Sequence, residues 1–156
     1  ARGVDGILYT CSAFGEAIDA AAAARSEPTL KPNEAMFEAA LDIAVEKGGD
    51  LVMLATFPPS MESMEEEFEA QRAARGVTVN LRSVGVSAAR DALNKGDGAA
   101  HDRLLAEAAG RVGPCAAIIF AHFSMDRAHI AVSGTVKMPV LSPPTNAVQQ
   151  LRGLLS

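Results

Sequence analysis

The sequence predicts an α/β fold in which parallel sheets are flanked by helices. Short apolar runs recur along the chain without hydrophobic alternation, which is typical of strands buried on both faces. The segments between these runs carry apolar residues at helical spacing, so strand and helix alternate along the chain. Hydrophobic residues make up 49% of the 156 residues and charged residues 21%, a composition sufficient for a packed core.

Five segments are expected to form strands. The first covers residues 5–10 and ends at Cys11, and the second covers residues 50–55 and ends at Thr56. Polar or titratable side chains therefore follow the carboxyl ends of strands, where α/β sheets place their ligand sites. The last three strands are expected over residues 77–84, 116–120 and 138–141.

Helices are expected between the strands, each beginning near a side chain that can accept hydrogen bonds from free backbone amides. The expected N-caps are Asn33, Ser87, Ser124 and Thr145. The helix over residues 61–75 carries its glutamates early and its arginines late, which suits the helix dipole. Its glutamate run is expected to be a solvated face. The expected helices span residues 33–47, 61–75, 87–94, 98–112, 124–132 and 145–155.

Cys11 and His122 are the candidate catalytic residues. Each follows an apolar strand and a small residue and precedes a helix entry, so two facing lobes would place them across a cleft. A thiol beside free amides at a helix N-terminus has a lowered pKa, and the same amides can hold a substrate carboxylate. Histidine exchanges protons near neutral pH, so this pair could act on opposite sides of one carbon.

Composition and spacing argue against several other functions. A net charge of −5 and an aromatic content of 4% disfavour nucleic-acid binding, and no apolar run approaches the ~20 residues of a membrane helix. The two cysteines are too far apart for a disulfide framework and are expected to be reduced thiols in a cytoplasmic protein. Cys115 is expected at the strand end away from the site. His101 and His129 are expected to be solvated, and no histidine pair has metal-ligand spacing with a third ligand.

Four short motifs together resemble the aspartate/glutamate/hydantoin racemase superfamily. Residues 10–15, Thr-Cys-Ser-Ala-Phe-Gly, resemble its first cysteine motif, in which small polar residues follow the cysteine. Residues 121–124 fall where that superfamily has its second cysteine, so His122 stands in place of that cysteine. The hydroxyl-proline turns at residues 56–58 and 142–145 resemble the turn after the first strand of the second lobe and the return into the first lobe.

The resemblance implies two pseudo-symmetric α/β lobes around a small carboxylate substrate, with no cofactor and no metal. Residues 1–30 would end the first lobe, residues 31–137 would form the second, and residues 138–156 would return to the first. Because the chain enters its first strand after only five residues, we expect the first lobe to be incomplete at its N-terminus. An exposed sheet edge invites pairing, so a homo-oligomer is expected.

The implied activity is a cofactor-independent racemase or isomerase that moves a proton at the acidic carbon of an amino-acid or hydantoin-like substrate. The Cys11 thiolate would act as acid and base. Because His122 replaces the second cysteine, a one-cysteine decarboxylase or lyase of the same superfamily stays open. A cysteine hydrolase and a ligand-binding module without catalysis also stay open. The expected substrate contacts are Ser12, Ala13, Thr56, Phe123, Ser124 and Thr145.

Overall fold

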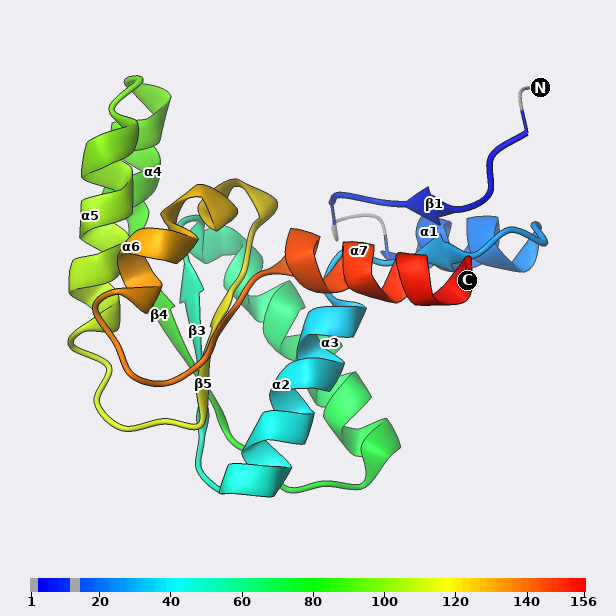
Figure 1. Cartoon of the computed structure of the whole chain (residues 1–156), viewed down its shortest axis with the longest axis horizontal. Helices are drawn as coiled ribbons and strands as arrows, with labels where there is room; N and C mark the ends of the chain where they lie inside the picture. Colours follow the sequence, from blue (N-terminus) through cyan, green and yellow to red (C-terminus); the bar gives the residue numbers. More distant parts are fainter. Residues whose placement is uncertain (1–2, 12–14) are drawn as a thin grey trace.

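The computed structural model describes residues 3–11 and 15–156 and confirms an α/β fold with parallel sheets flanked by helices (Figure 1). The main sheet has four parallel strands in the order β4–β3–β5–β6. These strands are β3 (Leu51–Ala55), β4 (Leu81–Gly85), β5 (Ala117–Phe120) and β6 (Val140–Leu141). The strand expected from residue 77 therefore begins four residues later, and the last strand is shorter than expected.

The two central strands are buried on both faces, as their unbroken apolar sequences predict. All residues of β3 and β5 are buried. Along β3, Leu51 and Met53 enter one hydrophobic core, whereas Val52 and Leu54 enter a second core on the opposite face. Parallel strands that are covered on both faces hold their carboxyl ends at one edge, and the candidate site lies in the loops there.

Helices cover both faces of the main sheet. One face carries α2 (Glu34–Lys47) and α3 (Met61–Arg75), and the other carries α4 (Ser87–Asn94), α5 (Gly98–Ala109) and α6 (His129–Ser133). None of the helices in the described part of the chain is long and apolar enough to cross a membrane.

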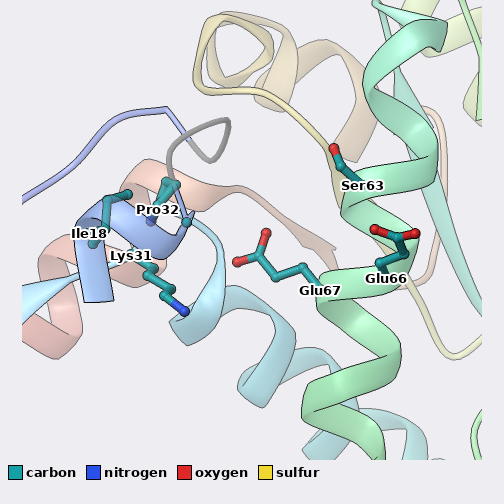
Figure 2. Close-up of a pocket in the computed structure, with 7 residues that line it drawn as sticks. Ile18, Lys31, Pro32, Ser63, Glu66 and Glu67 are labelled. Carbon is teal, nitrogen blue, oxygen red and sulfur yellow. The ribbon is translucent and has the colours of Figure 1, made fainter. Parts of the chain in front are cut away.

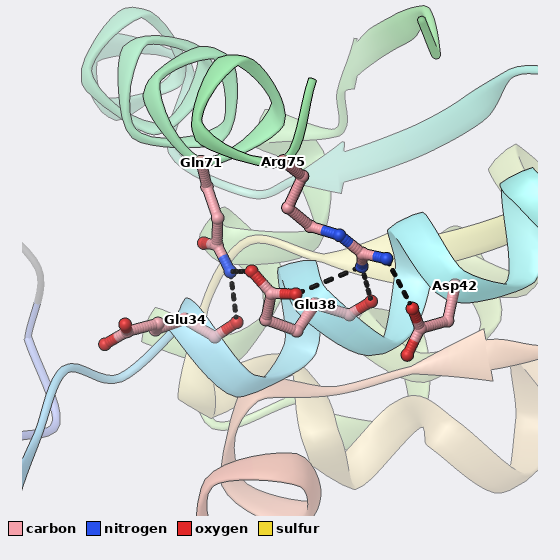
Figure 3. Close-up of polar contacts among 5 residues, drawn as sticks. All are labelled: Glu34, Glu38, Asp42, Gln71 and Arg75. Carbon is pink, nitrogen blue, oxygen red and sulfur yellow. Dashed lines mark hydrogen bonds and ion pairs between the residues drawn. The ribbon is translucent and has the colours of Figure 1, made fainter. Parts of the chain in front are cut away.

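Polar contacts join α2 to α3 along their exposed sides (Figure 3). Arg75 on α3 reaches the carboxylates of Glu38 and Asp42 on α2 at 3.0 and 2.8 Å. One turn earlier, the Gln71 amide donates to the Glu38 carboxylate and, at 2.9 Å, to the Glu34 carbonyl. Each exposed pair contributes little alone, but together these contacts join α3 to α2 over one helical turn.

A second, two-stranded parallel sheet pairs β1 (Ile7–Leu8) with β2 (Thr29–Leu30), and α1 (Gly15–Ala23) lies between these strands in the chain. The strand β2 was not expected from the sequence. The helix α7 (Pro143–Leu154) packs against α2 and β1, so the last helix of the chain lies beside the first strand (Figure 1). A Cβ at Gly6 would lie 2.7 Å from Leu151 Cδ1, so glycine allows this close approach.

Three of the expected helix caps are wrong. Ser87 is the first residue of α4. Ser124 lies inside a 3₁₀ helix, η3 (Phe123–Ala128), and Thr145 lies inside the first turn of α7. Proline fits the first helical positions because its φ is already helical and its missing amide needs no partner, so α7 begins at Pro143. The residues that precede these three helices are Val86, His122 and Ser142.

Candidate functional site

A cavity of about 90 Å³ lies where the chain leaves β1 and β5. Cys11 comes from the loop after β1, and His122 and Phe123 come directly after β5. The Ala121 amide donates to the Leu54 carbonyl at 2.9 Å, which fixes the backbone just before His122. The structure therefore brings both candidate catalytic residues to one cavity. Its lining residues are Thr10, Cys11, Pro32, Asn33, Ala121, His122 and Phe123.

Cys11 supplies the thiol of this cavity and is exposed. The expected contacts Ser12 and Ala13 lie outside the described residues, and α1 begins at Gly15. Cys115 lies before β5 and lines a separate cavity. Burial raises the pKa of the Cys115 thiol, so the two thiols differ in both place and environment.

The His122 ring has a hydroxyl beside each nitrogen. Thr56 Oγ1 lies 3.3 Å from Nδ1, and Ser60 Oγ lies 2.8 Å from Nε2. The Ser60 hydroxyl also donates to the Phe57 carbonyl at 2.9 Å. These three contacts form together when Nε2–H donates to Ser60 and the Thr56 hydroxyl donates to Nδ1, because Ser60 has one proton to give. The contacts therefore assign the Nε2–H tautomer to the neutral ring.

Ser60 is a site residue that was not expected from the sequence. The 3₁₀ turn η2 (Pro58–Ser60) follows β3 and returns Ser60 toward the strand end from which Thr56 projects. The signal was the order Thr-Phe-Pro-Pro-Ser, in which two prolines favour a turn and a second hydroxyl follows four residues after the first.

The surroundings of His122 favour the uncharged form of its ring. Burial lowers the pKa of His122, and the positive charge of Arg90 lowers it further. An uncharged ring can accept a proton without first losing one, and its protonated form is a stronger acid than an ordinary imidazolium.

A second cavity, of about 320 Å³, shares His122 with the first. Of the expected substrate contacts, Thr56 and Ser124 line this second cavity, and Phe123 lines the first. Thr145 lines neither; it is exposed on α7, and Ser142 Oγ lies 3.4 Å from its hydroxyl. The lining residues of the second cavity are Thr56, Phe57, Arg90, Leu93, Asn94, His122 and Ser124.

A third cavity, of about 300 Å³, shares Pro32 with the first and is lined by part of the glutamate run on α3. Figure 2 shows the Glu67 carboxylate directed from α3 toward the segment containing Lys31 and Pro32. Asn33 Nδ2 donates to Glu67 Oε2 at 3.1 Å instead of capping α2. Burial raises the pKa of Glu67, so the expectation of a solvated glutamate face is wrong at this residue.

Two histidines that were expected to be exposed to solvent are buried or half-buried in the structure. His101 is fully buried on α5, where its Nδ1 lies 2.8 Å from Asp102. Its Nε2 has no hydrogen-bond partner among the described residues. His129 is half-buried, and its Nε2 donates to the Val140 carbonyl at 2.9 Å. Charged neighbours in the sequence suggested exposure for His101, but its own side of α5 faces the core.

Within residues 3–11 and 15–156, no group of three or more histidine, cysteine, aspartate or glutamate side chains is placed to hold a metal ion. No protein-family model matches the sequence, and no curated protein matches it. The structure is similar to a crystal structure of a glutamate racemase isoform from Bacillus anthracis, with a TM-score of 0.74 and 12% sequence identity. The match covers 97% of this chain and 58% of the racemase chain. The chain therefore has a glutamate-racemase-like fold and spans somewhat more than half the length of that protein.

Proposed function

We propose that this chain carries the catalytic cysteine of a cofactor-independent racemase or isomerase. The reaction moves a proton at the acidic carbon of a small carboxylate substrate. The observation that supports this most is the shared cavity: an exposed thiol and a half-buried imidazole of lowered pKa line one small space at the ends of two strands. The racemase-like fold adds support at the level of architecture.

In the proposed reaction, the Cys11 thiolate removes the proton from the substrate carbon. The electron pair is then delocalised into the neighbouring carboxylate or carbonyl. A proton returns to the opposite face of the same carbon from protonated His122, so the substrate is inverted and its composition is unchanged. In the reverse direction, neutral His122 takes the proton and the Cys11 thiol supplies one.

The contacts of His122 add a step to this scheme. Thr56 lines the second cavity and its hydroxyl lies 3.3 Å from Nδ1, so a proton can pass between the ring and that cavity through Thr56. A hydroxyl can do this because it accepts one proton as it gives another.

A one-thiol decarboxylase or lyase is the second candidate. It is favoured by the presence of one thiol in the described lining of the cavity and by the hydroxyls that occupy both nitrogens of His122. In this reaction the substrate loses carbon dioxide, the electron pair stays on the carbon, and Cys11 supplies the proton from one face.

Proton NMR in D₂O tests both candidates. Each enantiomer of a panel of amino acids and 5-substituted hydantoins is incubated with the wild-type protein, Cys11→Ser, His122→Ala and the control Cys115→Ser. We expect loss of the signal of the acidic hydrogen with wild type and Cys115→Ser, and a rate at least about 10²-fold lower with Cys11→Ser. For the racemase, His122→Ala should exchange one enantiomer and convert neither.

The second candidate is tested with substituted malonic acids, which should release carbon dioxide in a Cys11-dependent manner and give one enantiomer of the product. Exchange that survives in Cys11→Ser contradicts both assignments of the thiol. Exchange and decarboxylation both absent in the wild-type protein would favour a ligand-binding module.

A further inference from the structure

The cavity beyond His122 is lined by both polar and apolar side chains. Its volume of about 320 Å³ suits a small ligand, whereas the 90 Å³ cavity at Cys11 has room for only a few non-hydrogen atoms. His122 lines both spaces, so the two cavities adjoin at its side chain.

Arg90 is the cationic residue in the lining of this larger cavity. Its guanidinium carbon lies 4.0 Å from the centre of the Phe57 ring, which supports one face of the planar group. Arg90 forms no ion pair with a carboxylate among residues 3–11 and 15–156. A stacked guanidinium whose edge is not paired can bind a carboxylate through two parallel hydrogen bonds.

The neighbouring polar groups match the same ligand. Thr56 and Ser124 bring hydroxyls to the cavity, and Asn94 brings an amide that can donate. No aspartate or glutamate is among the residues that line it, so nothing in this lining repels an anion. Phe57 and Leu93 add apolar surface to the same lining.

We propose that this cavity is an anion subsite, in which Arg90 binds a carboxylate of the substrate while the reactive carbon lies between Cys11 and His122. The proposal rests on the proposed function for the position of the reactive carbon, but the anion subsite itself can be tested without turnover. Arg90 is then a residue that determines specificity, because it selects ligands that carry a negative charge at this distance from the acidic carbon.

Binding of succinate and of its neutral counterpart, succinamide, tests the subsite. Affinities are measured by NMR titration at constant ionic strength for wild type, Arg90→Gln, Arg90→Lys and Lys95→Gln. Lys95 is a matched control because it follows α4, is exposed, and is absent from the lining of the cavity. Arg90 is itself exposed, so its replacement should leave folding intact, which circular dichroism verifies.

We expect Arg90→Gln to weaken succinate binding about tenfold or more and to leave succinamide binding within about twofold. Arg90→Lys should fall between wild type and Arg90→Gln, because it keeps the charge but loses the planar fork. Lys95→Gln should bind both probes as wild type does. Equal loss of succinate affinity in Arg90→Gln and Lys95→Gln would show that general surface charge is responsible and would overturn the proposal.

The outcomes separate this proposal from the proposed function. Arg90-dependent succinate binding without Cys11-dependent hydrogen exchange supports the anion subsite and contradicts the racemase or isomerase. Cys11-dependent exchange with no effect of Arg90→Gln on succinate binding overturns the anion subsite and leaves the catalytic assignment standing. Failure of the wild-type protein to bind succinate at tens of millimolar also overturns the subsite.

Discussion

Ser60 Oγ lies 2.8 Å from Nε2 of His122, and the same hydroxyl donates to the Phe57 carbonyl. The imidazole is therefore oriented by a side chain from the turn after β3, although His122 itself follows β5. Because β3 and β5 are adjacent in the sheet, the contact joins two neighbouring strand ends. Orientation of the ring therefore depends on the turn that carries Ser60, and this turn leads directly into α3.

Replacement of Ser60 by alanine should remove the hydrogen bond that orients the His122 ring. The Nε2–H proton of His122 should exchange rapidly with water in Ser60→Ala and be lost from the NMR spectrum, whereas in wild type the hydrogen bond should slow its exchange. The lost hydrogen bond should lower the free energy of unfolding by about 1 kcal/mol. Ser87→Ala is the control, since Ser87 is exposed at the start of α4. An unchanged Nε2–H signal in Ser60→Ala would show that Ser60 does not protect this proton, and a wild-type ring protonated only at Nδ1 would contradict the assigned tautomer.

Arg90→Gln should raise the pKa of His122. In wild type, burial lowers this pKa first and the charge of Arg90 lowers it further, so removal of the charge reverses only the second effect. Besides Arg90, the titratable group that shares a cavity with His122 is Cys11; Thr56 and Ser60 are neutral. The titration midpoint of the His122 Cε1 proton, followed by NMR, should therefore move up toward the ordinary value of about 6.5 without reaching it. A downward movement would show that Arg90 does not act on His122 through its charge.

The two thiols should react at different rates. Cys11 is exposed, whereas Cys115 is half-buried and burial raises the pKa of its thiol, so less thiolate is present and access is poorer. Iodoacetamide at pH 7 followed by peptide mapping should label Cys11 about tenfold faster or more. In the presence of denaturant the two rates should converge, which controls for intrinsic reactivity. Faster labelling of Cys115 in the folded protein would contradict the assigned site.

The sequence predicts the main sheet because its signals are local. The apolar runs at β3 and β5 have no polar interruption, so burial on both faces follows from composition alone. The helix over residues 61–75 is also correct at both ends. Its C-terminus is fixed by Gly76, which adopts the left-handed conformation with φ 64° that glycine tolerates best.

Features created by tertiary contacts are absent from the sequence pattern. The strand β2 has only two residues and exists because it pairs with β1, so no periodicity marks it. The same reason explains the residues missed at the site. Strand ends indicate where Cys11 and His122 lie, but Ser60 and Arg90 reach His122 from a turn and from α4 on different segments of the chain. The proposed roles of Ser60 and Arg90 depend on distances that only the folded chain provides.

Glu67→Gln should stabilise the protein at neutral pH. Burial raises the pKa of Glu67 in the folded state, so the folded protein prefers the protonated side chain more than the unfolded chain does. A raised folded pKa gives stability that is fully present below the unfolded pKa, near 4.5, and is lost as the pH rises through the folded value. Glutamine removes the buried charge and keeps an oxygen that can accept from Asn33 Nδ2, so it should raise Tm by about 1–3 °C at pH 7. The gain should vanish below about pH 4, where wild-type Glu67 is itself protonated.

Thermal unfolding of Glu67→Gln and of the exposed neighbour Glu66→Gln across this pH range measures the effect. A gain in Tm for Glu67→Gln that is independent of pH, or an equal gain for Glu66→Gln, would exclude burial of the Glu67 charge as the cause.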